Sequence, residues 1–298
     1  IGMTISAILA AFRPPCRATH LSVPLDVMRA PAPSGRPAVN LARMIEAAEL
    51  HDDAALIALA HELEAAQSPV FVVGEGARDA VGWILSLATR MNAAVVATPH
   101  GKGLVSPWHP QFRGVFGFSG HASADAVLRA PETDCVVAVG TSFGEWASAG
   151  WDPAALLSPR LVHVDADLEN FAAAPQARLH VRGAPARVFE RLHELIGLRE
   201  APALTRGGAR RPWLKLVYPA DAQTPPGPAD APEPNCLLDE PAKALSDATP
   251  IKPQRLLRDL PRLLPPGTRY LADGNSASFW AIHYLHIPDR RGTERRRA

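Results

Sequence analysis

The residues with the clearest chemical potential are two glycines that follow a short apolar run. The segment reads Val70-Phe-Val-Val-Gly74-Glu-Gly76-Ala-Arg78-Asp79, which predicts a strand, a glycine turn and the start of a helix. Glycine lets the backbone turn tightly, and the free amides at a helix N-terminus favour a phosphate. Gly74 and Gly76 are therefore candidate contacts for a phosphorylated cofactor. The alternative is a turn that serves only packing.

As a dinucleotide-binding fingerprint this segment is incomplete. Asp79 occupies the place of the third glycine, and its charge would oppose a pyrophosphate. The second predicted strand ends in Thr98-Pro-His100, without an acidic residue able to hold a ribose. These departures favour a packing turn over an NAD site, and they weaken the hypothesis of an independent NAD-dependent oxidoreductase.

Two other groups of residues allow weaker hypotheses. Gly117-Phe-Ser119-Gly-His121 resembles a nucleophile elbow, but His121 replaces its last glycine and no strand directly precedes it, so a serine hydrolase is not favoured. His163, Asp165 and Asp167 alternate along a predicted strand and its exit, where they share one face. They could ligate a metal, although polar residues at a strand end more often cap loops or helices.

The last two candidates are His283 and His286, which flank aromatic and aliphatic residues on a predicted helix. We interpret these two histidines as packing residues.

Short apolar runs alternate with longer amphipathic stretches in the middle of the chain. The runs predict strands at Val70–Val73, Ala94–Ala97, Cys135–Val139, Leu161–Val164 and Leu179–Val181. The amphipathic stretches predict helices at Ala54–Ala66, Ala80–Met91, Ala122–Arg129 and Ala186–Ile196. Continuous apolar strands are typical of parallel sheets that are covered on both faces. The alternation predicts an α/β fold with a doubly wound, mostly parallel, Rossmann-like sheet.

Composition divides the chain into four parts. Residues 1–30 end in an apolar run, His20–Asp26, which predicts a last strand. The α/β pattern covers residues 41–197, and residues 201–250 form a proline-rich linker with little periodicity. In residues 251–298 structure resumes with a predicted helix at Pro253–Leu264 and a short strand at Tyr270–Ala272.

Bulk properties exclude several classes of function. A hydrophobic fraction of 47% and a charged fraction of 20% are those of a soluble globular protein. The formal net charge of +1 indicates no nucleic-acid partner and no membrane surface. Three widely spaced cysteines, Cys16, Cys135 and Cys236, indicate no disulfide framework and a reducing, cytoplasmic setting.

Five segments in this order resemble motifs of one enzyme family. They are His20–Val27, Ser68–Arg78, Thr98–Gly103 followed by Gly114–Gly117, Thr133–Phe143, and Val162–Asp165. The chain resembles the thiamine-diphosphate (ThDP) enzymes of the acetolactate synthase, pyruvate oxidase and benzoylformate decarboxylase type over about residues 15–197. Tyr270–Ser276, with Phe279-Trp280 after it, resembles the entry of the family's diphosphate-binding domain.

The resemblance implies chemistry on 2-keto acids, either carboligation or decarboxylation. In the complete enzyme ThDP attacks the keto carbonyl, and Mg²⁺ anchors its diphosphate. The glutamate that activates ThDP and the metal-binding element are expected outside this chain, so we expect a fragment that is inactive alone. The turn Gly274-Asn275-Ser276 is where relatives touch the diphosphate. The complete enzyme is implied to be a homodimer or homotetramer.

The resemblance also raises the question of FAD, which some relatives bind across the central domain. Gly74, Gly76 and Arg78 match the turn that those relatives use. The arginine that they carry after the fourth strand is missing, because Gly140–Glu145 contains none. FAD is therefore possible but doubtful. A non-catalytic nucleotide-binding or interaction module on the same sheet is the alternative to an enzyme fragment.

Overall fold

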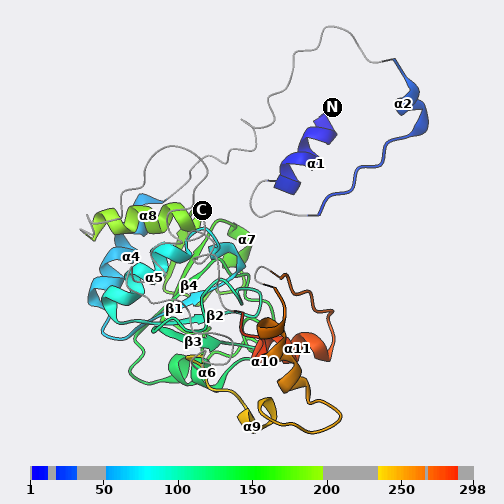
Figure 1. Ribbon diagram of the computed structural model, residues 1–298. Coiled ribbons are helices and arrows are strands. Elements are labelled where there is room, and N and C mark those ends of the chain that lie inside the picture. The colour runs from blue at the N-terminus through cyan, green and yellow to red at the C-terminus, as the bar shows by residue number, and fades with distance from the viewer. Residues whose placement is uncertain (1, 13–17, 32–51, 197–233, 266–267, 288–298) are drawn as a thin grey trace, which may run out of the picture. The chain divides into compact units, whose positions relative to one another are not determined.

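The computed structural model describes residues 2–12, 18–31, 52–196, 234–265 and 268–287 (Figure 1). The chain divides into two compact units, residues 1–50 and residues 51–298. Each unit is described by itself. The second unit holds every residue of the sites discussed below.

A six-stranded sheet of parallel strands forms the centre of the second unit. Its strands are β1 (Pro69–Val73), β2 (Ala94–Ala97), β3 (Phe112–Val115), β4 (Cys135–Val139), β5 (Leu161–Asp165) and β6 (Leu179–Arg182), in the spatial order β3-β2-β1-β4-β5-β6. The chain runs outward from β1 to β3 and then returns to β4 beside β1. This order confirms the predicted doubly wound fold, and the order reverses between β1 and β4.

Helices cover both faces of the sheet. The helical elements of this region are α4 (Asp53–Ala65), η1 (Glu75–Ala77), α5 (Val81–Met91), α6 (Ala122–Arg129), α7 (Leu168–Phe171) and α8 (Pro185–Leu195). Successive strand residues point to opposite faces, so Phe71 and Val73 pack with α4, α5 and α8, whereas Val70 and Val72 pack on the face of α6. Two buried cores explain why β1 and β4 are apolar at each position.

One strand of the sheet does not appear among the predicted elements. The edge strand β3 reads Phe-Arg-Gly-Val, and its glycine, Gly114, has φ of +106°. Its pairing with β2 shifts in register between Val95 and Ala97. A buried strand is recognised in a sequence by a continuous apolar run. Two of the four residues of β3 are an arginine and a glycine, so the strand has no such run.

Three helices follow the sheet domain, coloured gold to red in Figure 1: α9 (Pro241–Ala244), α10 (Pro253–Leu263) and α11 (Ser276–Tyr284). The predicted helix at Pro253–Leu264 is thus confirmed. The strand predicted at Tyr270–Ala272 is wrong, because these residues have no regular structure and Leu271 is 99% exposed. A strand needs a neighbouring strand for its backbone hydrogen bonds and a packed layer for its apolar side chains, and this segment has neither among the described residues.

The predicted proline-rich linker is described from residue 234 onward, and its earlier part lies outside the described residues. Asn235 donates its backbone amide to the Pro107 carbonyl at 2.8 Å and its side-chain amide to the His109 carbonyl at 2.9 Å. Leu237 donates its amide to the hydroxyl of Ser123 at 2.9 Å. Residues 235–239 are therefore fastened to the sheet domain.

The first unit contains α1 (Gly2–Phe12) and α2 (Leu25–Arg29). The strand predicted at His20–Asp26 is absent: residues 18–24 have no regular structure, and α2 begins at Leu25. Leu25, Val27 and Met28 are exposed, so among the described residues this apolar run has no packing partner that would favour an extended strand.

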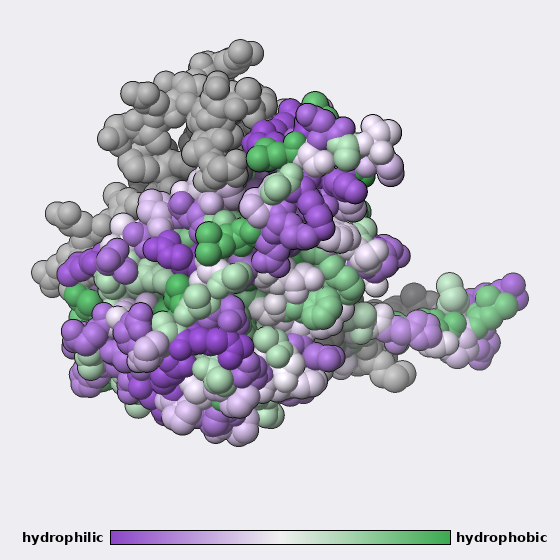
Figure 2. All heavy atoms as spheres, turned by 90° about the horizontal axis from the view of Figure 1, so that it is seen from below, coloured by the Kyte–Doolittle hydropathy of each residue, from purple (hydrophilic) through white to green (hydrophobic). Residues whose placement is uncertain are grey.

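The described surface mixes polar and apolar side chains. On the face drawn in Figure 2, hydrophilic residues (purple) are interspersed with apolar ones (green). No described helix has the length and apolar character needed to cross a lipid bilayer.

Candidate functional site

The predicted glycine turn lies where the strand order reverses, and it contacts the turn that follows β4. Gly74 donates its amide to the Val139 carbonyl, and Gly76 donates its amide to the Gly140 carbonyl, both at 2.9 Å. A Cβ atom on Gly74 would lie 2.2 Å from the Gly140 oxygen. The glycines are therefore needed for backbone to meet backbone at this point.

Gly140 completes the same contact from the other side. Its φ is +61°, and a Cβ atom there would lie 2.4 Å from the Ala77 amide nitrogen. The amides of Gly74 and Gly76 are thus engaged with β4 and its exit, while Arg78 is exposed at the start of the following turn. This geometry favours the packing interpretation of the turn. Cofactor binding by Gly74, Gly76 and Arg78 stays a prediction.

His121, the last residue of the segment that resembles a nucleophile elbow, is a buried bridging residue. Its Nδ1 accepts the Val115 amide at 2.9 Å, so its Nε2 must carry the proton, which it donates to the His283 carbonyl at 3.0 Å. The side chain is held neutral, because burial, Lys102 and His283 lower its pKa from 6.5 to about 3. Both ring nitrogens are engaged, so His121 cannot serve as the base for Ser119.

His283 makes the complementary bridge from α11. Its Nε2 accepts the Asp239 amide at 2.8 Å, and its Nδ1 donates to the Gly120 carbonyl at 2.9 Å. The rings of His283 and His121 are stacked with centroids 4.6 Å apart. We call these two residues the histidine clamp. The sequence predicted packing for His283, and the structure adds hydrogen bonds that join α11 to both the sheet domain and residues 235–239.

Tyr284 strengthens the attachment of α11. Its hydroxyl donates to the Asp239 carbonyl at 2.5 Å, and its side chain is buried. Burial and the charges of Asp239 and Glu240 raise the pKa of Tyr284, so its hydroxyl stays protonated and able to donate. Two consecutive side chains thus fix the C-terminal end of α11.

The opposite end of α11 carries the predicted diphosphate turn, Gly274-Asn275-Ser276. Asn275 caps the helix, its side-chain oxygen accepting the Ala277 amide at 2.8 Å. All three residues are exposed, and a Cβ atom on Gly274 would meet nothing within 4 Å. A helix N-terminus that is open to solvent can approach a diphosphate. Contact of this turn with the diphosphate of ThDP stays a prediction.

The surroundings of this turn are acidic. Asp273 accepts the Gly274 amide at 2.8 Å through its carboxylate. A shallow pocket of about 380 Å³ begins at Ser276 and is lined by aromatic residues of α11, by Asp239 and by Glu240. A bare diphosphate would be repelled by these carboxylates. A diphosphate neutralised by a cation would be repelled less.

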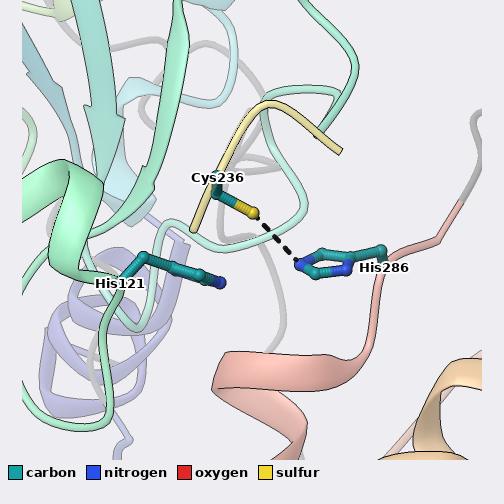
Figure 3. Close-up of side chains that lie close together, drawn as sticks. All are labelled: His121, Cys236 and His286. Carbon is teal, nitrogen blue, oxygen red and sulfur yellow. Dashed lines mark hydrogen bonds between the residues drawn. The ribbon is translucent and has the colours of Figure 1, made fainter. Parts of the chain in front are cut away.

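One group of three side chains in the described part of the chain has the composition of a metal site. His121, Cys236 and His286 bring their donor atoms within 4.8 Å of one another (Figure 3). The tautomer of His121 opposes ligation, because a metal at Nε2 would have to displace the proton given to His283 while Nδ1 keeps the Val115 bond. Mg²⁺ also prefers oxygen ligands, which this group does not offer.

Of the three strand-end residues His163, Asp165 and Asp167, only Asp167 caps a helix, α7. Asp165 accepts the Asp167 amide at 2.8 Å, and Asp167 accepts the Glu169 amide at 3.1 Å at the start of α7. His163 bonds to the Thr141 carbonyl through Nε2 at 3.0 Å. The capping interpretation is confirmed for Asp167 and, as a turn before the helix, for Asp165, whereas His163 instead bonds to the loop after β4.

Comparison with known proteins identifies the sheet domain. Residues 56–192 match a protein family described as "Thiamine pyrophosphate enzyme, central domain". The chain is 32% identical over 172 residues to a Mycobacterium tuberculosis protein named as an acetolactate synthase large subunit, covering 54% of this chain and 31% of that protein. It is 31% identical over 220 residues to a Pseudomonas aeruginosa protein named as a 2-ketoarginine decarboxylase, covering 71% of this chain and 37% of that protein.

A solved structure shares the fold. It is described as a thiamin diphosphate-dependent enzyme from Mycobacterium smegmatis and superposes with a TM-score of 0.60 at 21% identity. The alignment covers 95% of this chain and 48% of that one. The chain thus spans about a third of the two curated relatives and about half of the solved structure.

Proposed function

Because the chain belongs, through its central domain, to the thiamine-diphosphate enzyme family, we propose that it takes part in a ThDP- and Mg²⁺-dependent reaction of a 2-keto acid. Carboligation of the acetolactate synthase kind and decarboxylation are the two reaction types that its relatives' names favour. When bound, ThDP supplies the electron sink that accepts the electrons left by carbon dioxide. The role of the described residues is to position the cofactor-binding region.

The histidine clamp is the observation that carries this proposal. His121 and His283 hold α11 against the end of β3, and the N-terminus of that helix presents Gly274, Asn275 and Ser276. Because α11 has only nine residues, the position of a diphosphate contact at its N-terminus depends on how firmly the whole helix is held. We propose that the central domain fixes this helix and thereby the turn.

Domain limits and assembly follow from the same proposal. Residues 1–30 end a pyrimidine-binding domain, residues 41–197 form the central domain, residues 201–250 are the linker, and residues 251–298 begin the diphosphate-binding domain. The family's active sites lie between subunits, so the working form is a homodimer or homotetramer. We place the protein in the cytoplasm, since Cys135 and Cys236 are not in disulfides.

The 298-residue chain is expected to lack turnover by itself. In this proposal Gly274, Asn275 and Ser276 contact the diphosphate, and the described residues include no cluster of three or more carboxylates that could hold Mg²⁺. Calorimetric titration with ThDP and Mg²⁺ should therefore show no tight binding. Tight Mg²⁺-dependent binding would contradict a purely positioning role.

The reaction is tested in a chimera of the P. aeruginosa relative in which residues 52–287 of this chain replace the matching segment. We expect ThDP-dependent release of carbon dioxide from a 2-keto acid, reduced by His283→Ala and unchanged by substitution of the exposed His61. A chimera that folds and binds ThDP but leaves 2-keto acids unchanged would contradict the proposal.

Flavin and nucleotide binding are tested on the same chain. The engaged amides of Gly74 and Gly76 argue against both, as does the missing arginine after β4. We therefore expect no visible flavin absorbance in the purified protein and no heat of binding with FAD or NAD. Tight binding of either nucleotide would support the alternative of a nucleotide-binding module.

A further inference from the structure

Cys236, His286 and Lys102 form a cluster that the proposed function does not use. Cys236 belongs to residues 235–239, His286 follows the end of α11, and Lys102 lies in the loop after β2. We propose that Cys236 is a modifiable thiol, oxidised by hydrogen peroxide to a sulfenic acid. This proposal is independent of the reaction assigned to the family.

The first support is geometric. The sulfur of Cys236 lies 3.6 Å from Nε2 of His286, within hydrogen-bond distance for sulfur, as the dashed line in Figure 3 marks. The residue is 9% exposed, so the thiol is shielded but not sealed from a reagent as small as peroxide. Cys236 is not in a disulfide.

The second support is the charge beside the thiol. Lys102 interacts electrostatically with Cys236, and the same attraction that favours the ammonium favours the thiolate. Burial lowers the pKa of Lys102 to about 8, so at neutral pH the ammonium still predominates. His286 stays neutral, since burial and the nearby Lys102, His121 and His283 lower its pKa well below 6.5. The neutral His286 can accept a hydrogen bond from the thiol, and Lys102 can stabilise the thiolate that forms when the proton leaves to solvent.

A second cysteine in the same domain provides an internal contrast. Cys135 begins β4, is fully buried, and has a pKa raised by desolvation. Burial in an apolar core makes a thiol inert. We therefore expect Cys236 to react and Cys135 to stay unchanged, because a thiol reacts when it is accessible and its thiolate is stabilised.

The step is balanced with peroxide as the oxidant. The thiolate of Cys236 attacks one peroxide oxygen, so an S–O bond forms and the O–O bond breaks. The leaving hydroxide takes up a proton and departs as water. Sulfur is oxidised to the sulfenic acid and peroxide is reduced, with no further reactant required.

Oxidation would act on the attachment of residues 235–239. The backbone amides of Asn235, Leu237 and Asp239 all bond to the sheet domain or α11, and Cys236 lies in the middle of this run. An oxygen atom added to the sulfur needs space beside His286, and it also needs polar groups with which to form hydrogen bonds. Oxidised protein should therefore release residues 234–240 more readily than reduced protein.

The experiment uses the double variant Cys16→Ser/Cys135→Ser, which leaves Cys236 as its one thiol. The variant is treated with peroxide once as the folded protein and once unfolded in urea. In both cases mass spectrometry follows the rate at which the chain gains one oxygen atom. We expect the folded chain to react roughly tenfold faster than the unfolded one. A cyclic diketone that labels sulfenic acids identifies the product.

Matched variants test the charge. Lys102→Met should slow the folded-state rate by roughly tenfold, and Lys102→Arg should restore most of it, with thermal unfolding showing that both variants fold. Equal rates in the Met and Arg variants would overturn the electrostatic argument. A folded chain that reacts no faster than the unfolded one overturns the proposal, as does tight zinc binding that abolishes the reaction.

Discussion

His121 and His283 are 162 residues apart in the sequence, yet His121 donates a hydrogen bond to the backbone carbonyl of His283 at 3.0 Å while their rings stack. Each imidazole is held in one neutral tautomer by a backbone amide that donates to it. The pair therefore joins α11 to the sheet domain through rings that each donate one hydrogen bond and accept another. This attachment yields several measurable consequences.

Replacing His283 with alanine should release α11. The change leaves the Asp239 amide and the Gly120 carbonyl without their partner, and a buried backbone group left unsatisfied costs about 1–3 kcal/mol. We expect the free energy of unfolding to fall by roughly 2–4 kcal/mol and residues 268–287 to become the first site of limited proteolysis. His61→Ala, at an exposed position of α4, is the control and should change neither.

Acid should weaken the fold through its buried histidines. His121 and His163 each have a pKa lowered from 6.5 to about 3, first of all by desolvation. Since the unfolded chain binds these protons more readily, the stabilising contribution is complete above pH 6.5 and is lost as the pH falls towards 3. Each histidine contributes a slope of about 1.4 kcal/mol per pH unit in that window.

Urea unfolding at a series of pH values measures this slope. His163→Leu removes one of the two groups, and the Nδ1 atom of His163 is buried without a hydrogen-bond partner among the described residues. The variant should lose the contribution of His163 alone, about 1.4 kcal/mol per pH unit between pH 6.5 and 3, while the other buried histidines with a lowered pKa keep theirs. An unchanged slope would mean that other groups govern acid unfolding.

Alanine at Gly140 should be far more costly than alanine at Gly103. Both glycines have positive φ, +61° and +85°, so each substitution pays the left-handed backbone cost of about 1–2 kcal/mol. A Cβ atom at Gly140 also meets the Ala77 nitrogen at 2.4 Å, whereas one at Gly103 meets nothing within 4 Å. Unfolding should show at least about 2 kcal/mol between the two variants; similar losses would refute the packing role.

Two substitutions at Asn275 test whether its side chain caps α11. Asn275→Ala removes the acceptor for the Ala277 amide and should speed hydrogen exchange in the first turn of α11, at a cost of about 1 kcal/mol. Asn275→Asp keeps the acceptor and should leave exchange unchanged. If both variants exchange alike, the side chain of Asn275 does not cap the helix in solution.

Much of the fold could be predicted from local sequence. The strands at Ala94–Ala97 and Cys135–Val139 and the helix at Ala122–Arg129 have the predicted bounds, because a buried parallel strand is apolar throughout and an amphipathic helix repeats with its own period. The family could also be predicted, since its motifs are short stretches of consecutive residues. Where packing partners decide, as for β3 and for the segment His20–Asp26, local sequence was insufficient.

By itself, the sequence predicted five of the six strands of the sheet, the longer helices between them and the thiamine-diphosphate enzyme family. Only the tertiary structure decided that Gly74 packs on Gly140, that His121 bonds to His283 and that Cys236 meets His286. These pairs join segments between 50 and 162 residues apart, or strands that become neighbours through the reversal of sheet order. Local propensity carries no information about such contacts, because they exist only once the sheet has brought the ends of its strands together.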